Sequence, residues 1–80
     1  MDSIKVPATD LRAGDQAPDY HGQLAYTVQS VRRATAAQAR QVPDMVRGDI
    51  IAVIQWVDGG LGERWWPASS EVSLLARGAR

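Results

Sequence analysis

The clearest pattern of hydrophobic positions lies in the second half of the chain. Residues Ile50–Val57, IIAVIQWV, are β-branched and apolar at nearly every position instead of every second one. Such a run is typical of a central strand that is covered on both faces. The turn-forming residues DGGLG follow at 58–62, and Glu63–Trp66 then has the composition of a returning strand. The pattern therefore predicts a β-hairpin with a glycine-rich turn.

A second apolar pattern, at Gln23–Arg33, alternates imperfectly. Leu24, Tyr26 and Val28 share one parity, whereas Val31 falls on the other. One extra residue in a strand moves all later side chains to the opposite face, which is what a β-bulge does. We therefore predict one bent strand here, of the kind that closes small barrels.

Shorter segments complete the predicted set of strands. Ser3–Val6 is expected to be a short strand that ends at Pro7, and Val72–Ala76 a last short strand. Residues 16–23, QAPDYHGQ, have the composition of an exposed loop. Residues 68–71, ASSE, are expected to form a single tight turn before the last strand.

The segment Ala34–Gln41 allows two interpretations. It contains good helix formers and no glycine, but it is only about two turns long, below the length at which an isolated helix is stable in water. It is either a helical turn or the tip of a long hairpin. Pro43 and Asp44 end the segment in both cases.

About five short strands, one long hairpin loop and a tight turn in a single small domain favour a small closed or nearly closed barrel, because closing the sheet removes exposed edges. The order of elements resembles the SH3-like barrel family, in which a glycine-bearing hairpin leads to a tryptophan-containing strand, a one-turn 3-10 helix and the last strand. The matching segments are Asp58–Gly62, Trp65–Pro67, Ala68–Glu71 and Val72–Leu75, and Asp10–Asp15, DLRAGD, resembles the turn that opens many such barrels.

The resemblance implies an all-β fold over residues 1–80, a small five-stranded SH3-like barrel with a 3-10 turn before the last strand. The chain lacks the paired tyrosine motif that peptide-binding SH3 domains carry near their first strand. Binding of proline-rich peptides is therefore not carried over. The chain is also similar to small proteins that are common in actinobacteria and their phages.

Composition narrows the possible functions of the 80 residues. The chain has no cysteine and one histidine, so neither a disulfide, a metal site nor any other cofactor is expected. Nine acidic and nine basic residues give a net charge of zero, which removes the strongest sequence argument for nucleic-acid binding. The longest apolar run, Ile50–Ile54, is far shorter than the roughly 20 residues that span a bilayer. With no signal-peptide pattern at the N-terminus, we expect a cytoplasmic protein without a membrane partner.

The adjacent tryptophans Trp65 and Trp66 must split between two faces, because successive side chains of a strand point in opposite directions. We expect Trp65 in the core and Trp66 outside, toward the arginine-rich loop. The outer tryptophan either holds a base, a peptide or another subunit, or packs beneath residues 34–47. Trp56, on the facing strand, is expected to stack across the hairpin from one of the two.

Four arginines form a basic cluster in a neutral protein. Arg32, Arg33, Arg40 and Arg47 are opposed within their segment only by Asp44. The planar guanidinium suits phosphate, and arginines beside a tryptophan are typical of single-stranded nucleic-acid surfaces. In the alternative interpretation the arginines are solvated, pair with acidic residues of the first 22 positions, or contact another subunit.

No combination of residues indicates an enzyme. His21 is alone in a polar loop without a nearby serine or cysteine nucleophile, and DGGLGE at 58–63 lacks the lysine and hydroxyl residue of a phosphate-binding loop. We therefore name no catalytic residue.

The first hypothesis is a non-enzymatic interaction module that binds a protein partner or itself, as a homodimer, through an exposed Trp/Arg surface. A small domain with a limited core often gains stability from oligomerisation, and tryptophan and arginine are enriched at interface hot spots. The second hypothesis is nucleic-acid binding through the 32–47 segment and an exposed tryptophan. The candidate binding residues are Trp66, Trp65, Trp56, Arg32, Arg33, Arg40 and Arg47.

Overall fold

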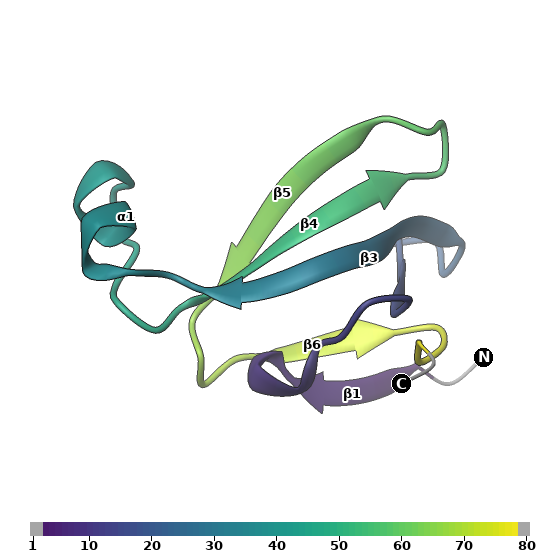
Figure 1. The fold of residues 1–80 in the computed structure, drawn as a ribbon. Coiled ribbons are helices and arrows are strands. Elements are labelled where there is room, and N and C mark those ends of the chain that lie inside the picture. The colour runs from purple at the N-terminus through teal and green to yellow at the C-terminus, as the bar shows by residue number, and fades with distance from the viewer. Residues whose placement is uncertain (1–2, 79–80) are drawn as a thin grey trace.

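The computed structural model describes residues 3–78 and shows an all-β fold with one short α-helix (Figure 1). The strands are β1 (Ile4–Pro7), β2 (Gln16–Pro18), β3 (Leu24–Arg33), β4 (Ile50–Trp56), β5 (Leu61–Trp66) and β6 (Glu71–Leu74). A 3-10 helix, η1 (Ala8–Asp10), follows β1, and the helix α1 (Ala36–Gln41) lies between β3 and β4.

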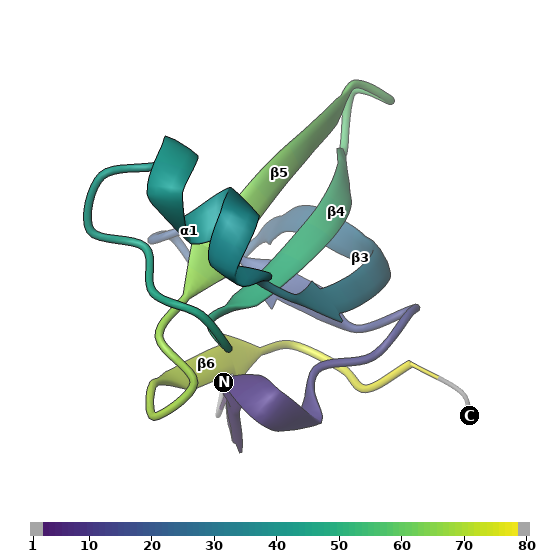
Figure 2. The same cartoon turned by 60° about the vertical axis from the view of Figure 1, so that its left-hand side comes forward.

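The strands form two antiparallel sheets. One has four strands in the order β2-β3-β4-β5, and the other pairs β1 with β6. A single bridge links them: the Gln16 N–H donates to the Ala76 carbonyl at 3.0 Å, and the Leu75 N–H donates to the Gln16 carbonyl at 2.7 Å. Figures 1 and 2 show the two-stranded sheet lying below the larger one, with α1 at one end of the molecule.

This arrangement differs in two respects from the predicted five-stranded barrel, which was expected to be closed or nearly closed. There are six strands between residues 3 and 78, because β2 lies in the segment 16–23 that the sequence assigned to a loop. The described residues also form two bridged sheets and not a closed barrel. Strand β2 escaped sequence reasoning because three residues are too few for a visible alternation, and Pro18 is typical of loops.

The predicted β-bulge in β3 is confirmed. Val28 lies opposite Ile54 and Ser30 opposite Val53, so Gln29 is the extra residue. Before the bulge Tyr26 and Val28 face the main core, and after it Val31 packs against the same core. The change of parity along the sequence therefore marks the bulge.

The predicted hairpin between β4 and β5 is also confirmed. The Trp56 N–H donates to the Gly60 carbonyl, and the Gly59 N–H donates to the Trp56 carbonyl, both at 2.8 Å. Gly59 has a φ of +94°, which a three-residue hairpin loop with a bulged last position requires. The Asp58 side chain accepts the Gly60 N–H at 2.9 Å and fixes the loop.

The turn before the last strand is a single turn, as predicted, but it is not a 3-10 helix. One bond closes it, from the Ser70 N–H to the Pro67 carbonyl at 2.9 Å. Because no second bond of this type follows among the described residues, the turn does not continue into a helix. The 3-10 helix of the described chain is η1, between β1 and β2.

Of the two interpretations of the segment Ala34–Gln41, the structure contains the helix. The Thr35 hydroxyl accepts the Gln38 N–H at 3.1 Å, and the Gln38 side-chain oxygen accepts the Thr35 N–H at 3.0 Å. This capping box satisfies two backbone donors that a helix start leaves free. Since no residue of α1 is fully buried, its caps and the neighbouring loop hold it in place.

Two hydrophobic clusters lie on opposite sides of β4. Buried residues of the main cluster are Val6, Ala8, Leu11, Ala17, Tyr26, Val28, Ile50, Ala52, Ile54, Val72 and Leu74. Buried residues of the second cluster are Ala34, Met45 and Ile51. Because Ile50 and Ile51 enter different clusters, the prediction of a central strand covered on both faces is confirmed.

The fully buried carboxylate of Asp15 ties the end of the described chain to the loop before β2. One oxygen accepts the Arg12 N–H at 3.0 Å; the other accepts the Arg77 Nε–H at 3.1 Å and the Gly78 N–H at 2.7 Å. A Cβ on Gly78 would collide with the Ala13 carbonyl, so this approach requires glycine.

We expect Asp15→Asn to destabilise the protein by about 3 kcal/mol, because breaking a buried charged network leaves the remaining groups without partners. Asp58→Asn, which changes an exposed carboxylate in the hairpin loop, should alter stability by less than about 0.5 kcal/mol. The free energy of unfolding in urea measures both. Equal effects of the two substitutions would show that the Asp15 network does not stabilise the fold.

Candidate functional site

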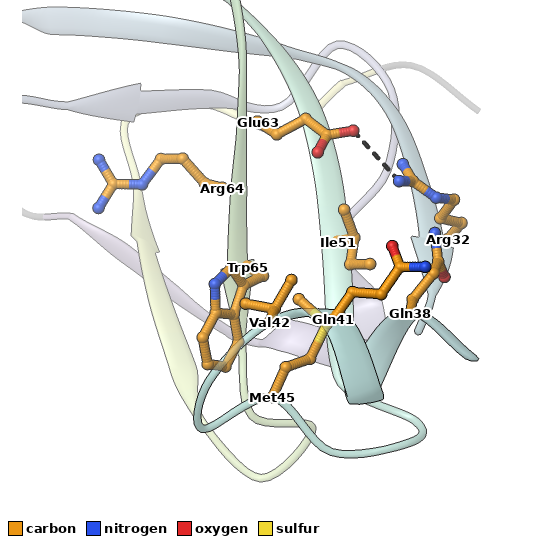
Figure 3. Close-up of a pocket in the computed structure, with 9 residues that line it drawn as sticks. All are labelled: Arg32, Gln38, Gln41, Val42, Met45, Ile51, Glu63, Arg64 and Trp65. Carbon is orange, nitrogen blue, oxygen red and sulfur yellow. Dashed lines mark hydrogen bonds and ion pairs between the residues drawn. The ribbon is translucent and has the colours of Figure 1, made fainter. Parts of the chain in front are cut away.

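A groove of about 240 Å³ lies between α1, the loop that follows it, and the outer face of β4 and β5 (Figure 3). We call it the α1 groove. The residues that line it are Arg32, Gln38, Gln41, Val42, Met45, Ile51, Glu63, Arg64 and Trp65. Apolar side chains lie at its Trp65 end, and an ion pair lies at its other end (Figure 3).

Trp65 forms the large apolar wall of the α1 groove. It is half-buried and packs against the second hydrophobic cluster, together with Ala39 and Val42. Because Trp65 lies opposite Ile51 on β4, the two side chains share the outer face of the sheet. The loop after α1 supplies Val42 and Met45 as its cover (Figure 3).

The predicted split of the two tryptophans is confirmed, but the assignment of sides is wrong. Trp66 lies opposite Ile50 and packs against the main core. Trp65 is the outer tryptophan, and it packs beneath the 34–47 segment, which was one of the two possibilities for the outer side chain. Alternation separates neighbours but does not say which face is the inner one.

Trp56 does not stack with either of these tryptophans, so that expectation is wrong. It lies at the opposite end of the β4–β5 hairpin, where it meets Tyr26 edge-to-face with ring centroids 5.4 Å apart. Its indole covers Gly62, where a Cβ would lie 3.0 Å from the Trp56 Nε1. Because Gly62 has no side chain, the ring can settle on the backbone of β5.

The basic cluster is divided by the fold. Arg32 enters the α1 groove and pairs with Glu63 at 3.1 Å, and both side chains are exposed. Arg33 points to the other face of β3, while Arg40 on α1 and Arg47 in the loop are exposed and do not line the groove. An exposed ion pair of this kind stabilises by about 0–1 kcal/mol.

None of these four arginines pairs with Asp10, Asp15 or Asp19 within residues 3–78, which excludes the alternative that the acidic N-terminal segment neutralises them there. The Asp15 carboxylate is engaged by Arg77 and Arg12. Of the seven candidate residues, the structure therefore brings Arg32 and Trp65 together in the α1 groove. Trp56, Trp66, Arg33, Arg40 and Arg47 lie outside it.

Sequence reasoning missed the other seven groove residues. Glu63 lies two positions before Trp65 on β5 and Ile51 lies opposite it, so strand parity could have indicated both. Val42 and Met45 flank a proline and an aspartate in a loop, and no periodic signal marks them. They enter the site only because the loop folds back over β5.

The outer edge of β5 borders the α1 groove and has no strand beside it among the residues that the structure describes. The Trp56 N–H bonds to Gly60, and pairs that exchange hydrogen bonds recur at every second position of an antiparallel ladder. The backbone groups of Gly62, Arg64 and Trp66 therefore face β4. Those of Leu61, Glu63 and Trp65 face away from the sheet.

Within residues 3–78, no three His, Cys, Asp or Glu side chains gather as a metal site, and no helix has the length and apolar character to cross a membrane. His21 is exposed and stacks on Tyr20 with ring centroids 4.1 Å apart.

Comparison with protein-family models, with curated proteins and with solved structures finds no match to the chain. The function therefore has to be inferred from the residues and their geometry.

Alkaline pH should weaken the fold through Tyr26. Burial raises the pKa of the Tyr26 hydroxyl, and the Arg64 guanidinium, 5.6 Å from the ring centroid, opposes the shift. Because the folded state then holds the phenol proton more strongly than the unfolded state, the folded protein loses stability as the pH rises above about 10. Urea unfolding from about pH 8 to about pH 11 should show a smaller loss in Tyr26→Phe. Parallel curves would contradict a contribution from Tyr26.

Proposed function

We propose that the protein is a non-enzymatic interaction module that binds another protein chain, or a second copy of itself, through the outer face of β5 and the α1 groove. The observation that carries the proposal is the half-buried Trp65 in a groove beside a strand edge that no other strand of residues 3–78 pairs with. An aromatic anchor in an apolar pocket with a polar rim is the usual anatomy of a protein interface.

The side chains along the outer face of β5 fit this role. Leu61 shares that face with Glu63 and Trp65 by strand parity, and 71% of its surface is exposed. The Arg32–Glu63 ion pair lies between these two apolar positions and supplies the polar rim. A partner that covered the face would bury the leucine and the open side of the tryptophan together.

We also propose that the fold is an open member of the SH3-like barrel class. The pairing of the first strand with the last and the consecutive order β2-β3-β4-β5 support this assignment. The bend at Gln29 in β3 supports it as well, because a bulge turns a strand from one sheet toward another.

Nucleic-acid binding remains the second proposal, and one observation favours it. Arg33, Arg40 and Arg47 are exposed and form no ion pair within residues 3–78. The separation of the arginines favours the protein-binding proposal, because only Arg32 of the four lines the α1 groove with Trp65. Titration with single-stranded oligonucleotides at low salt separates the two: binding that weakens steeply with salt supports the nucleic-acid role.

The protein-binding proposal predicts that Leu61→Ser abolishes partner contact without unfolding the protein, because this side chain is exposed. Val57→Ser is the matched control: Val57 is 67% exposed but lies in the hairpin loop beyond the β5 face. Chemical crosslinking of the purified protein detects self-contact, and co-purification of tagged protein from its own cell extract detects another chain. Crosslinks or a co-purified protein should be lost with Leu61→Ser and kept with Val57→Ser. Contacts that respond equally to both substitutions, or no contacts at all, would contradict the proposal.

A further inference from the structure

The two open strand edges of the described chain differ in a way that points to one of them as a pairing site. The β1 edge is four residues long and contains Lys5 and Pro7, two features with which proteins block edge-to-edge association. The β5 edge is six residues long, contains neither lysine nor proline, and pairs with β4 without a bulge. Strand β5 therefore pairs in continuous register and lacks lysine, proline and a bulge, and its charged residues are Glu63 and Arg64.

The free backbone groups of β5 are regularly spaced. Leu61, Glu63 and Trp65 direct their N–H and carbonyl groups away from the sheet, because the intervening residues bond to β4. Their side chains lie on the outer face, beside the α1 groove. An added strand would thus gain main-chain hydrogen bonds and side-chain contacts on the same three residues.

We infer that β5 pairs with the β5 of a second copy, antiparallel about a two-fold axis through Glu63. This inference rests on the proposed interaction function and names its occupant and geometry. A two-fold interface uses the same patch on both copies, so each favourable contact occurs twice. Two neutral chains also approach without net repulsion, because nine acidic and nine basic residues give a net charge of zero.

The register about Glu63 matches the side chains of the strand to one another. Leu61 falls opposite the second copy's Trp65, so the exposed leucine meets the open side of the groove tryptophan. Arg64 falls opposite the second copy's Gly62, whose inner side is covered by the Trp56 indole of that copy. The outer face thus gains two aliphatic–aromatic contacts, and on the inner face each Arg64 guanidinium lies near an indole of the other copy, an arrangement that cation–π attraction favours.

The centre of this register contains one unfavourable contact, which a substitution can test. The two Glu63 side chains lie directly opposite each other, and like charges at that position repel. Each is offset by its own Arg32 at 3.1 Å, which gives a neutral group of four charges. Neutralising Glu63 removes the repulsion between the two carboxylates and should leave the dimer at least as tight, whereas binding of a basic partner would weaken on the same change.

The decisive substitutions are Glu63→Pro and Glu63→Gln. Proline removes the outward N–H but no bond to β4, and the preceding Gly62 tolerates the backbone restriction that a proline imposes. Glutamine removes the charge and keeps the N–H. Sedimentation velocity over a concentration series should show a reversible dimer for the natural chain, a dimer at least as tight for Glu63→Gln, and a dissociation constant at least about tenfold higher for Glu63→Pro. Circular dichroism and tryptophan emission confirm that both variants fold.

Amide hydrogen exchange of the natural chain tests the same inference without a substitution. In dilute protein the amides of Glu63 and Trp65 should exchange quickly while that of Arg64 is protected, and concentrating the protein should slow the first two. A monomer at every concentration, or a dimer in which these amides stay fast, overturns the inference. Slowing that requires a different added protein overturns the second copy as the occupant. In each of these cases the proposed interaction function stands if a contact still depends on Leu61.

Discussion

Strand β4 carries large apolar side chains on both faces, and the rest of the molecule is arranged to cover them. Ile50 and Ile54 face the main core, and Ile51 faces the opposite side. Burying one such side chain stabilises by about 1.5–3 kcal/mol, so neither face can be left to solvent without a large loss. The neighbouring strand β5 follows the same rule, with Trp66 beside Ile50 and Trp65 beside Ile51. Two tryptophans in sequence are what a two-sided sheet requires at this point.

The connection between β3 and β4 covers the outer face of the four-stranded sheet. Ala34 and Met45 are buried there, and the buried Asp49 accepts the Val46 N–H at 3.0 Å, which holds the loop in a fixed turn. A helix of six residues is about 9 Å long, whereas a strand of six residues spans about 20 Å. The cover therefore reaches the Trp65 end of β5 and not the Leu61 end. The α1 groove and the exposed leucine both follow from this difference in length.

The sequence could predict the features that depend on neighbouring residues, but not those that depend on contacts between residues far apart in the chain. The hairpin, the bulge at Gln29 and the separation of Trp65 from Trp66 depend on neighbours along one strand, and simple parity found all three. Which tryptophan faces inward depends on which face of the larger sheet the β1–β6 sheet covers. The alternation of side chains along β5 does not identify that face. The place of Trp56 depends on register across the hairpin, and the entry of Val42 into the site depends on a loop folding back over β5. Contacts of this kind join residues that no local pattern connects.

The two sides of the described fold differ in how their strand edges are covered. At the β1–β6 side, Asp15 holds Arg77 and Gly78, and the bridge from Gln16 to Ala76 joins the last described residues to β2. That side is closed by buried charge and by main-chain bonds. At the β5 side the described chain has no equivalent link: the strand ends at Trp66, and the chain turns after Pro67 toward β6. The β1 edge contains Lys5 and Pro7, which disfavour pairing with another strand, whereas the β5 edge contains neither residue type. An added strand would therefore form main-chain hydrogen bonds more readily at β5, and the half-buried Trp65 lies along that edge. The same alternation that divides the two tryptophans between the faces thus places Trp65 where an added strand would meet it.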